Sequence, residues 1–178
     1  TKQIPIGFGV CILPYHHPVR VAERVSMVDH LSNGRVDFGT GRSAPYEQTG
    51  MGIDPRNTRE MWEESLSMVP EIWSSDWYSH EGKYWQVPER QVLPKPFQED
   101  HPPIWVAGRR DPAMKRAVRY GDGWLPYLYS PDRYRASVKK IVGLAAEQER
   151  DLTDFQWADF QFISIDDTRE KAGRAAAE

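Results

Sequence analysis

The chain has 178 residues, and its 23 Lys and Arg against 26 Asp and Glu give a formal net charge of −3. No lysine or arginine block stands out, so nucleic acids and anionic membranes are poor partners, and no apolar run approaches a membrane span. The single cysteine, Cys11, excludes an internal disulfide and fits a reducing compartment, so we expect a cytoplasmic protein of one domain.

The first part of the chain alternates between strand and helix patterns. Residues 4–13 are apolar and partly β-branched, which indicates a buried strand. A helix then begins at Pro18 and ends at the Ser32–Asn33–Gly34 stop signal. A second buried strand follows at residues 36–40, with Val36, Phe38 and Thr40 on one face.

A polar loop is predicted for residues 43–53, before a further helix. Asp54 and Pro55 are typical of a helix start, since aspartate caps the first turn and proline suits it. Residues 74–103 have many prolines and no regular pattern, so we interpret them as an irregular insertion loop with a short hairpin near residues 78–87.

The remaining residues repeat the strand–helix order. Short strands are predicted at residues 104–107 and 124–127, and helices open at Asp111–Pro112 and Ser130–Pro131. Residues 155–165 are predicted as a long strand, and a last helix runs from Arg169 to the end. Three side chains of that strand are candidates for the core: Phe160, Phe162 and Ile163.

Strict alternation favours a parallel sheet with helices outside it. The five predicted strands fit either an open doubly wound sheet or part of an eight-stranded barrel, and periodicity alone does not distinguish these. In both folds ligands bind where the strands end. The residues expected at that edge are Tyr15, His16, His17, Gly41, Arg42, Ser43, Arg59, Gly108, Arg109, Arg110, Tyr127 and Asp166.

Two glycine turns carry the strongest chemical signal. Gly39 and Gly41 precede Arg42, and Gly108 precedes Arg109, each close to a helix start. Backbone N–H groups and guanidinium groups together suit a phosphate, although salt bridges between loops would explain the arginines too. Histidines and carboxylates show no zinc spacing, so no metal site is expected, and no nucleophile elbow, P-loop or complete G-x-G-x-x-G occurs.

Several motifs together resemble the bacterial luciferase-like monooxygenases, a flavin-dependent (β/α)8-barrel family. They are Leu13–Pro14, His17–Pro18–Val19–Arg20, Ala22–Glu23, Leu31–Ser32–Asn33–Gly34–Arg35, Phe38–Gly39–Thr40–Gly41–Arg42, Pro94–Lys95–Pro96, Pro102–Pro103–Ile104–Trp105–Val106–Ala107–Gly108 and Gly121–Asp122–Gly123–Trp124. The resemblance implies a TIM barrel of which residues 1–178 are the central part, about strands 3 to 7, truncated at both ends.

The resemblance also implies FMN, or alternatively a deazaflavin, at the mouth of the barrel. Arg42 would hold the phosphate, assisted by Arg59 and the Gly108–Arg109 turn. A bend at Gly9–Val10, often with a cis peptide bond in the family, would face the flavin ring. The residues assigned to the cofactor are Gly9, Val10, Arg42, Ala44, Arg59, Gly108 and Arg109.

The implied activity is a monooxygenase that uses reduced FMN and O2 to oxidise a small organic substrate. Alternatives are a deazaflavin-dependent hydride-transfer enzyme and a flavin-binding protein without turnover. The resemblance implies a homodimer and a flavin reductase as partner, and it leaves the substrate open. The family's catalytic histidine falls outside this chain, so no catalytic residue is assigned. We expect the chain alone to be inactive and to fold poorly, because an incomplete barrel exposes strand edges.

Overall fold

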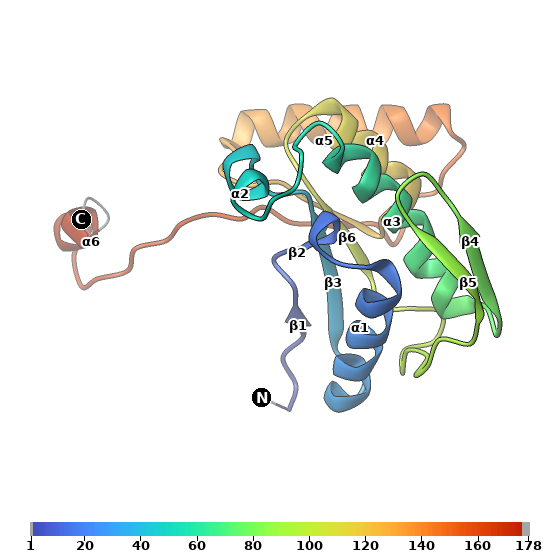
Figure 1. The fold of residues 1–178 in the computed structure, drawn as a ribbon. Coiled ribbons are helices and arrows are strands. Elements are labelled where there is room, and N and C mark those ends of the chain that lie inside the picture. The colour runs from blue at the N-terminus through green and yellow to red at the C-terminus, as the bar shows by residue number, and fades with distance from the viewer. Residues whose placement is uncertain (1, 176–178) are drawn as a thin grey trace.

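The computed structural model describes residues 2–175, which contain one parallel sheet covered by helices (Figure 1). The sheet order is β1, β3, β6, β7, β8, and β2 continues beside β3. All these pairs are parallel, so the predicted order is confirmed. The strands are β1 Ile6–Gly7, β2 Cys11–Ile12, β3 Val36–Gly41, β6 Ile104–Ala107, β7 Gly123–Leu125 and β8 Gln156–Trp157.

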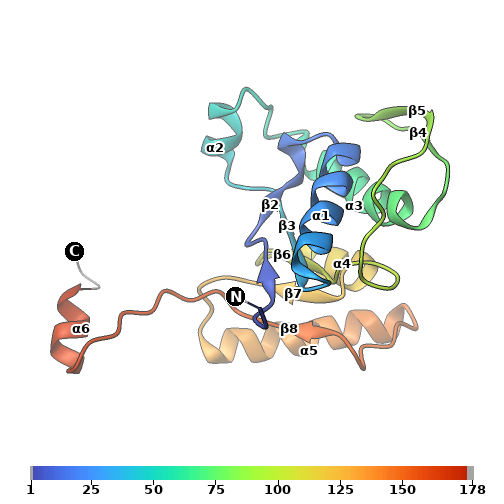
Figure 2. The same cartoon turned by 90° about the horizontal axis from the view of Figure 1, so that it is seen from below.

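Four long helices lie along one side of these strands in two perpendicular views (Figures 1 and 2). They are α1 Pro18–Ser32, α3 Thr58–Ser74, α4 Asp111–Tyr120 and α5 Pro131–Glu147. Three of them have proline in the first turn, as predicted, and α1 ends where Asn33 adopts a left-handed conformation with φ of 57°. A short 3₁₀ helix, Leu13–Tyr15, links β2 to α1.

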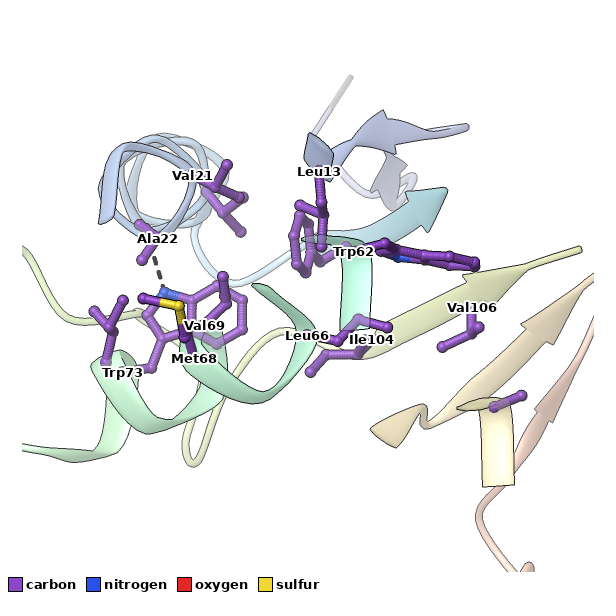
Figure 3. Packing of buried hydrophobic residues seen from close by; sticks show 14 of the residues in the cluster. Leu13, Val21, Ala22, Trp62, Leu66, Met68, Val69, Trp73, Ile104 and Val106 are labelled. Carbon is purple, nitrogen blue, oxygen red and sulfur yellow. Dashed lines mark hydrogen bonds between the residues drawn. The ribbon is translucent and has the colours of Figure 1, made fainter. Parts of the chain in front are cut away.

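The core lies between the sheet and helices α1, α3, α4 and α5, and Figure 3 shows part of it. Leu66 and Val69 of α3 are buried, together with Ile104 of β6. The Trp73 indole N–H donates a hydrogen bond to the carbonyl oxygen of Ala22 over 3.2 Å, which ties α3 to α1. Burial of these apolar side chains is the main force that holds the helices on the sheet.

The predicted hairpin in residues 74–103 is confirmed as β4 Tyr78–Glu81 and β5 Gln86–Arg90, an antiparallel pair. The chain after it is fastened to the core by Asp29 of α1, whose side chain is fully buried. This carboxylate accepts hydrogen bonds from the backbone N–H groups of Phe97 and Gln98 over 2.8 and 2.9 Å. A segment without regular structure thus has one fixed conformation at its end.

The prediction of one buried strand at residues 4–13 is wrong in two respects. The segment forms two short strands, separated at a cis peptide bond between Gly9 and Val10. The side chain of Ile6 is 40% exposed, because within the described residues β1 has a neighbouring strand only on the side of β3. Apolar composition predicted the burial, but composition does not say how many neighbours a strand has.

Residues 43–53 contain a helix, α2 Pro45–Gly50, where a loop was predicted. Pro45 supplies a first helical residue, and the Glu47 carboxylate accepts a hydrogen bond from the Ala44 N–H over 3.1 Å. The following helix, α3, begins at Thr58 instead of Asp54–Pro55. Asp54 forms a local turn instead, in which its Oδ1 accepts from the Arg56 N–H over 2.9 Å.

The long strand predicted at residues 155–165 is also wrong. Only β8, Gln156–Trp157, is regular, and Phe160 adds one isolated bridge to Tyr127. Phe162 and Ile163, predicted as core, are 78% and 77% exposed, because no element of the described chain packs over them. An extended segment then leads to α6, Arg169–Ala175, which starts as predicted; residues 176–178 lie outside the described residues.

Candidate functional site

A cavity of about 760 Å³ lies at the carboxyl ends of the parallel strands. All seven residues that the sequence assigned to the cofactor line it, although they come from four separate segments of the chain. They are Gly9, Val10, Arg42, Ala44, Arg59, Gly108 and Arg109. Ligands of α/β barrels bind at this end of the strands, so the position agrees with the prediction.

Arg42 follows β3 directly and is held by a buried polar network. Its Nη1 donates a hydrogen bond to Thr58 Oγ1 over 3.3 Å, and Thr58 Oγ1 donates to Gln48 Oε1 over 3.3 Å. Burial lowers the pKa of Arg42 below its usual value, and the neighbouring Arg59 and Arg116 lower it further. The guanidinium group stays charged at neutral pH and lies in a field of other positive charges, which an anion would relieve.

Glycines bring the backbone close together on the floor of the cavity. A Cβ atom on Gly41 would lie 2.4 Å from Cγ2 of Val10, so only glycine fits where β3 passes the Gly9–Val10 bend. Gly9 itself has nothing within 4 Å of its Cβ position. This leaves open space beside the bend, which a flat ligand could occupy.

The second glycine turn follows β6. Gly108 has a φ of +143°, and a Cβ atom there would lie 2.5 Å from that of Ala113. The turn therefore requires glycine for its conformation as well as for space. It leads into α4, whose first residues also line the cavity.

Two arginines that the sequence analysis did not single out also line the cavity. Arg116 on α4 is mostly buried, forms an ion pair with Glu63 at 2.9 Å and lies over the ring of Trp62. Arg133 is in the first turn of α5. The helix-start signal at Ser130–Pro131 could have indicated Arg133, because a helix that follows a strand begins at the ligand-binding edge.

Four candidate residues do not reach the cavity. Tyr15 and His16 are absent from its lining, and His17 instead caps α1 by accepting a hydrogen bond from the Val19 N–H over 3.3 Å. Asp166 lies in the extended segment before α6, 4.0 Å from Lys171. Ser43, Arg110 and Tyr127 do line the cavity, as predicted from their places after the strands.

The electrostatics of the cavity are dominated by arginine. Within residues 2–175, no carboxylate forms an ion pair with Arg42, Arg59, Arg109 or Arg133, whereas Arg116 is paired with Glu63. The lining carboxylate Glu47 is engaged with the Ser43 hydroxyl and the Ala44 N–H, and these bonds lower its pKa. Among the described residues no cluster of His, Cys, Asp or Glu could hold a metal, and no helix is long and apolar enough to cross a membrane.

The luciferase-like monooxygenase family model matches residues 1–178. The chain belongs to this family. It is 36% identical, over its whole length, to the oxygenase component of a flavin-dependent trigonelline monooxygenase from Acinetobacter baylyi. The chain spans 50% of the length of that relative.

Solved structures support the same assignment. The oxygenating constituent of 3,6-diketocamphane monooxygenase from Pseudomonas putida, solved in complex with FMN, is 26% identical with a TM-score of 0.80. The match covers 99% of our chain and 53% of the monooxygenase chain. An F420-dependent secondary alcohol dehydrogenase has the same fold, with a TM-score of 0.88 at 23% identity. That match covers 98% of our chain and 54% of the dehydrogenase chain. The predicted fold class, a partial (β/α)8 barrel, is confirmed.

Proposed function

We propose that this chain is part of a flavin-dependent monooxygenase, which uses reduced FMN and O2 to oxidise a small organic substrate. The observation that carries the proposal is the convergence of the glycine turns and arginines from four segments on one cavity. Its support from similarity is the 36% identical oxygenase component and the 26% identical FMN complex. That relative is named as an oxygenase component, which also supports a separate flavin reductase as partner.

The residues around the cavity fit a phosphate-bearing flavin. Arg42 and Arg59 offer positive charge with no carboxylate partner in the described chain. In the Gly108–Arg109 turn the Gly108 N–H donates to the Leu125 carbonyl oxygen, so the Arg109 N–H is the main-chain donor left beside the start of α4. We assign the phosphate to these groups. The open space beside Gly9 and Val10 suits the ring system, which needs a flat surface without side chains.

When bound, reduced FMN supplies the two electrons that allow one atom of O2 to enter an organic substrate while the other leaves as water. The chain's own residues bind and orient the ligands and exclude water from the cavity. Arg42 fixes one end of the ligand by a charge-assisted bond, and Trp62, Leu125 and Leu128 provide apolar walls. Among the described residues no histidine lines the cavity, and the lining carboxylate of Glu47 is engaged by Ser43 and Ala44, so no acid or base is assigned.

The test compares FMN with a deazaflavin. We expect the protein to bind FMN, measured by quenching of flavin fluorescence, more tightly than the deazaflavin. The reduced FMN complex should consume O2 in an oxygen electrode. A deazaflavin in its place would transfer hydride instead. Tighter binding of the deazaflavin would favour the hydride-transfer alternative, and no binding of either would overturn the proposal.

A further inference from the structure

The cavity has a second group of arginines that is separate from the one around Arg42. Arg109 and Arg133 both lie against the ring of Tyr129, with their guanidinium carbons 5.4 and 4.4 Å from its centre. The Arg109 guanidinium is also 4.9 Å from the ring of Tyr127. The groups that lower the pKa of Arg42, after burial, are Arg59 and Arg116 instead. Arg42 is bonded to Thr58, whereas Arg109 and Arg133 share the ring of Tyr129, so the two sets of arginines have different partners in one cavity.

Tyr129 holds this second group of arginines rigid. Its ring is buried, and its hydroxyl donates a hydrogen bond to the carbonyl oxygen of Arg109 over 2.6 Å. The Arg109 guanidinium lies against two tyrosine rings, so its planar face is occupied and its N–H edge is left for a ligand. Its Nε is buried and has no hydrogen-bond partner within the described residues. A buried donor without a partner is costly, and an anion would satisfy it.

Arg133 is unusual for its place in the helix. It is the third residue of α5, where the helix dipole favours negative charge and a cation is unfavourable. The adjacent Asp132 does not neutralise it, because the Asp132 carboxylate pairs with Arg135 at 2.8 Å. An anion bound at Arg133 would offset this unfavourable charge.

The walls near this region are apolar. Leu128, Phe160 and Phe162 line the same cavity as Tyr127, and the Phe160 and Phe162 rings are 5.4 Å apart in an edge-to-face arrangement. Phosphate alone would not use such walls, whereas an organic carboxylate would use both the charge and the apolar surface.

We propose that Arg109, Arg133 and the rings of Tyr127 and Tyr129 form a subsite for the carboxylate group of an apolar organic substrate, separate from the phosphate site at Arg42 and Arg59. The inference rests on the proposed function, of which it names the substrate class. Both sites would recognise an anion, so the experiment distinguishes a substrate carboxylate from the phosphate of the cofactor.

The experiment uses benzoate and its uncharged analogue benzamide as probes, titrated by calorimetry into the complete protein with and without bound FMN. We expect benzoate to bind more tightly than benzamide. Arg133→Gln should weaken benzoate binding about fivefold, and Arg109→Gln about tenfold, with little effect on benzamide. Arg133 is exposed, so its variant should fold even where the Arg109 variant does not.

Lys139→Gln is the matched control, because Lys139 lies on the same helix, is exposed and does not line the cavity. It should leave benzoate binding unchanged. FMN and riboflavin titrations of Arg133→Gln separate the two sources of anion, and both flavins should bind as in the wild type. If the protein bound benzoate as expected but no flavin, the proposed function would fail while the subsite would stand.

Three results would overturn the subsite. The first is equal binding of benzoate and benzamide. The second is no benzoate binding at roughly 10 mM, where a site of millimolar affinity would be mostly filled. The third is weaker binding of FMN but not of riboflavin in Arg133→Gln, which would assign Arg133 to the cofactor phosphate.

Discussion

Gln48 lies fully buried beneath Arg42, and its side-chain Nε2 donates a hydrogen bond to the main-chain oxygen of Arg42 over 2.7 Å. The same amide nitrogen donates to the oxygen of Ser43 over 3.0 Å, and its Oε1 accepts from Thr58. One side chain on α2 thus fixes both the end of β3 and the start of α3. The position of the Arg42 guanidinium depends on a residue that does not line the cavity.

Replacement of Gln48 by alanine should therefore loosen the phosphate site. Two buried carbonyl oxygens would lose their donor, which we expect to lower the free energy of unfolding by about 2–4 kcal/mol. FMN binding should weaken more than riboflavin binding, measured by flavin fluorescence. The control is Gln91→Ala, because Gln91 is exposed. Equal stability of the Gln48 and Gln91 variants in urea would contradict the role of the network.

In the complete protein, Arg42→Ala should weaken FMN binding and spare riboflavin, which lacks the phosphate. A charge-assisted hydrogen bond contributes roughly 1.5–3 kcal/mol, so the affinity should fall by about one to two powers of ten. Arg42→Lys should recover only part of this, since an ammonium group lacks the planar fork. Fluorescence titration with both flavins gives the answer. A similar loss for both would mean that Arg42 supports the fold or the ring instead.

Gly39→Ala should destabilise the sheet. A Cβ atom at Gly39 would lie 1.8 Å from the carbonyl oxygen of Phe8, and backbone atoms must move to make room. We expect a loss of about 3 kcal/mol in the free energy of unfolding, from urea denaturation.

The control for that change is Gly143→Ala in α5, where nothing lies within 4 Å of the Cβ position. Alanine there should stabilise the helix by about 0.5–1 kcal/mol. If both alanine variants shifted the free energy of unfolding in the same direction, the close approach of β3 to Phe8 would not explain the effect at Gly39.

Acid should weaken the start of α1 through His17. Burial lowers the pKa of His17 below its ordinary value of 6.5, Arg90 lowers it further, and Glu23 opposes this in part. The folded state thus favours the neutral ring, whose Nδ1 accepts from the Val19 N–H, while the unfolded chain takes up a proton near pH 6.5. This stabilisation is present above about pH 6.5 and is lost as the pH falls.

The measurement is the urea midpoint as a function of pH for the wild type and for His17→Asn. Asparagine retains an N-cap oxygen but does not titrate. We expect the difference in stability between the two proteins to change with pH between about 7 and 5 and to be constant above this window. A constant difference throughout would exclude His17 as a source of the pH dependence.

Most of the order of the fold follows from local sequence signals. Val36, Phe38 and Thr40 recur at period 2 and are buried, and Pro18 and Pro131 start helices. These signals are local, so no distant contact is needed to interpret them. The glycine–arginine turns predicted the edge of the sheet where the cavity lies. The roles of the seven assigned residues toward a cofactor stay predictions.

Which further side chains meet at the cavity depends on the tertiary structure. Gln48 is polar and sits in a six-residue helix with no apolar period, so nothing local predicts its burial beneath Arg42. Arg133 reaches the cavity because α5 packs beside α4, and Phe162 is exposed because nothing in the described chain covers it. Local patterns fix the elements, since they depend on neighbours in sequence. Convergence and burial depend on which elements are neighbours in space, and the packing of the whole sheet sets that.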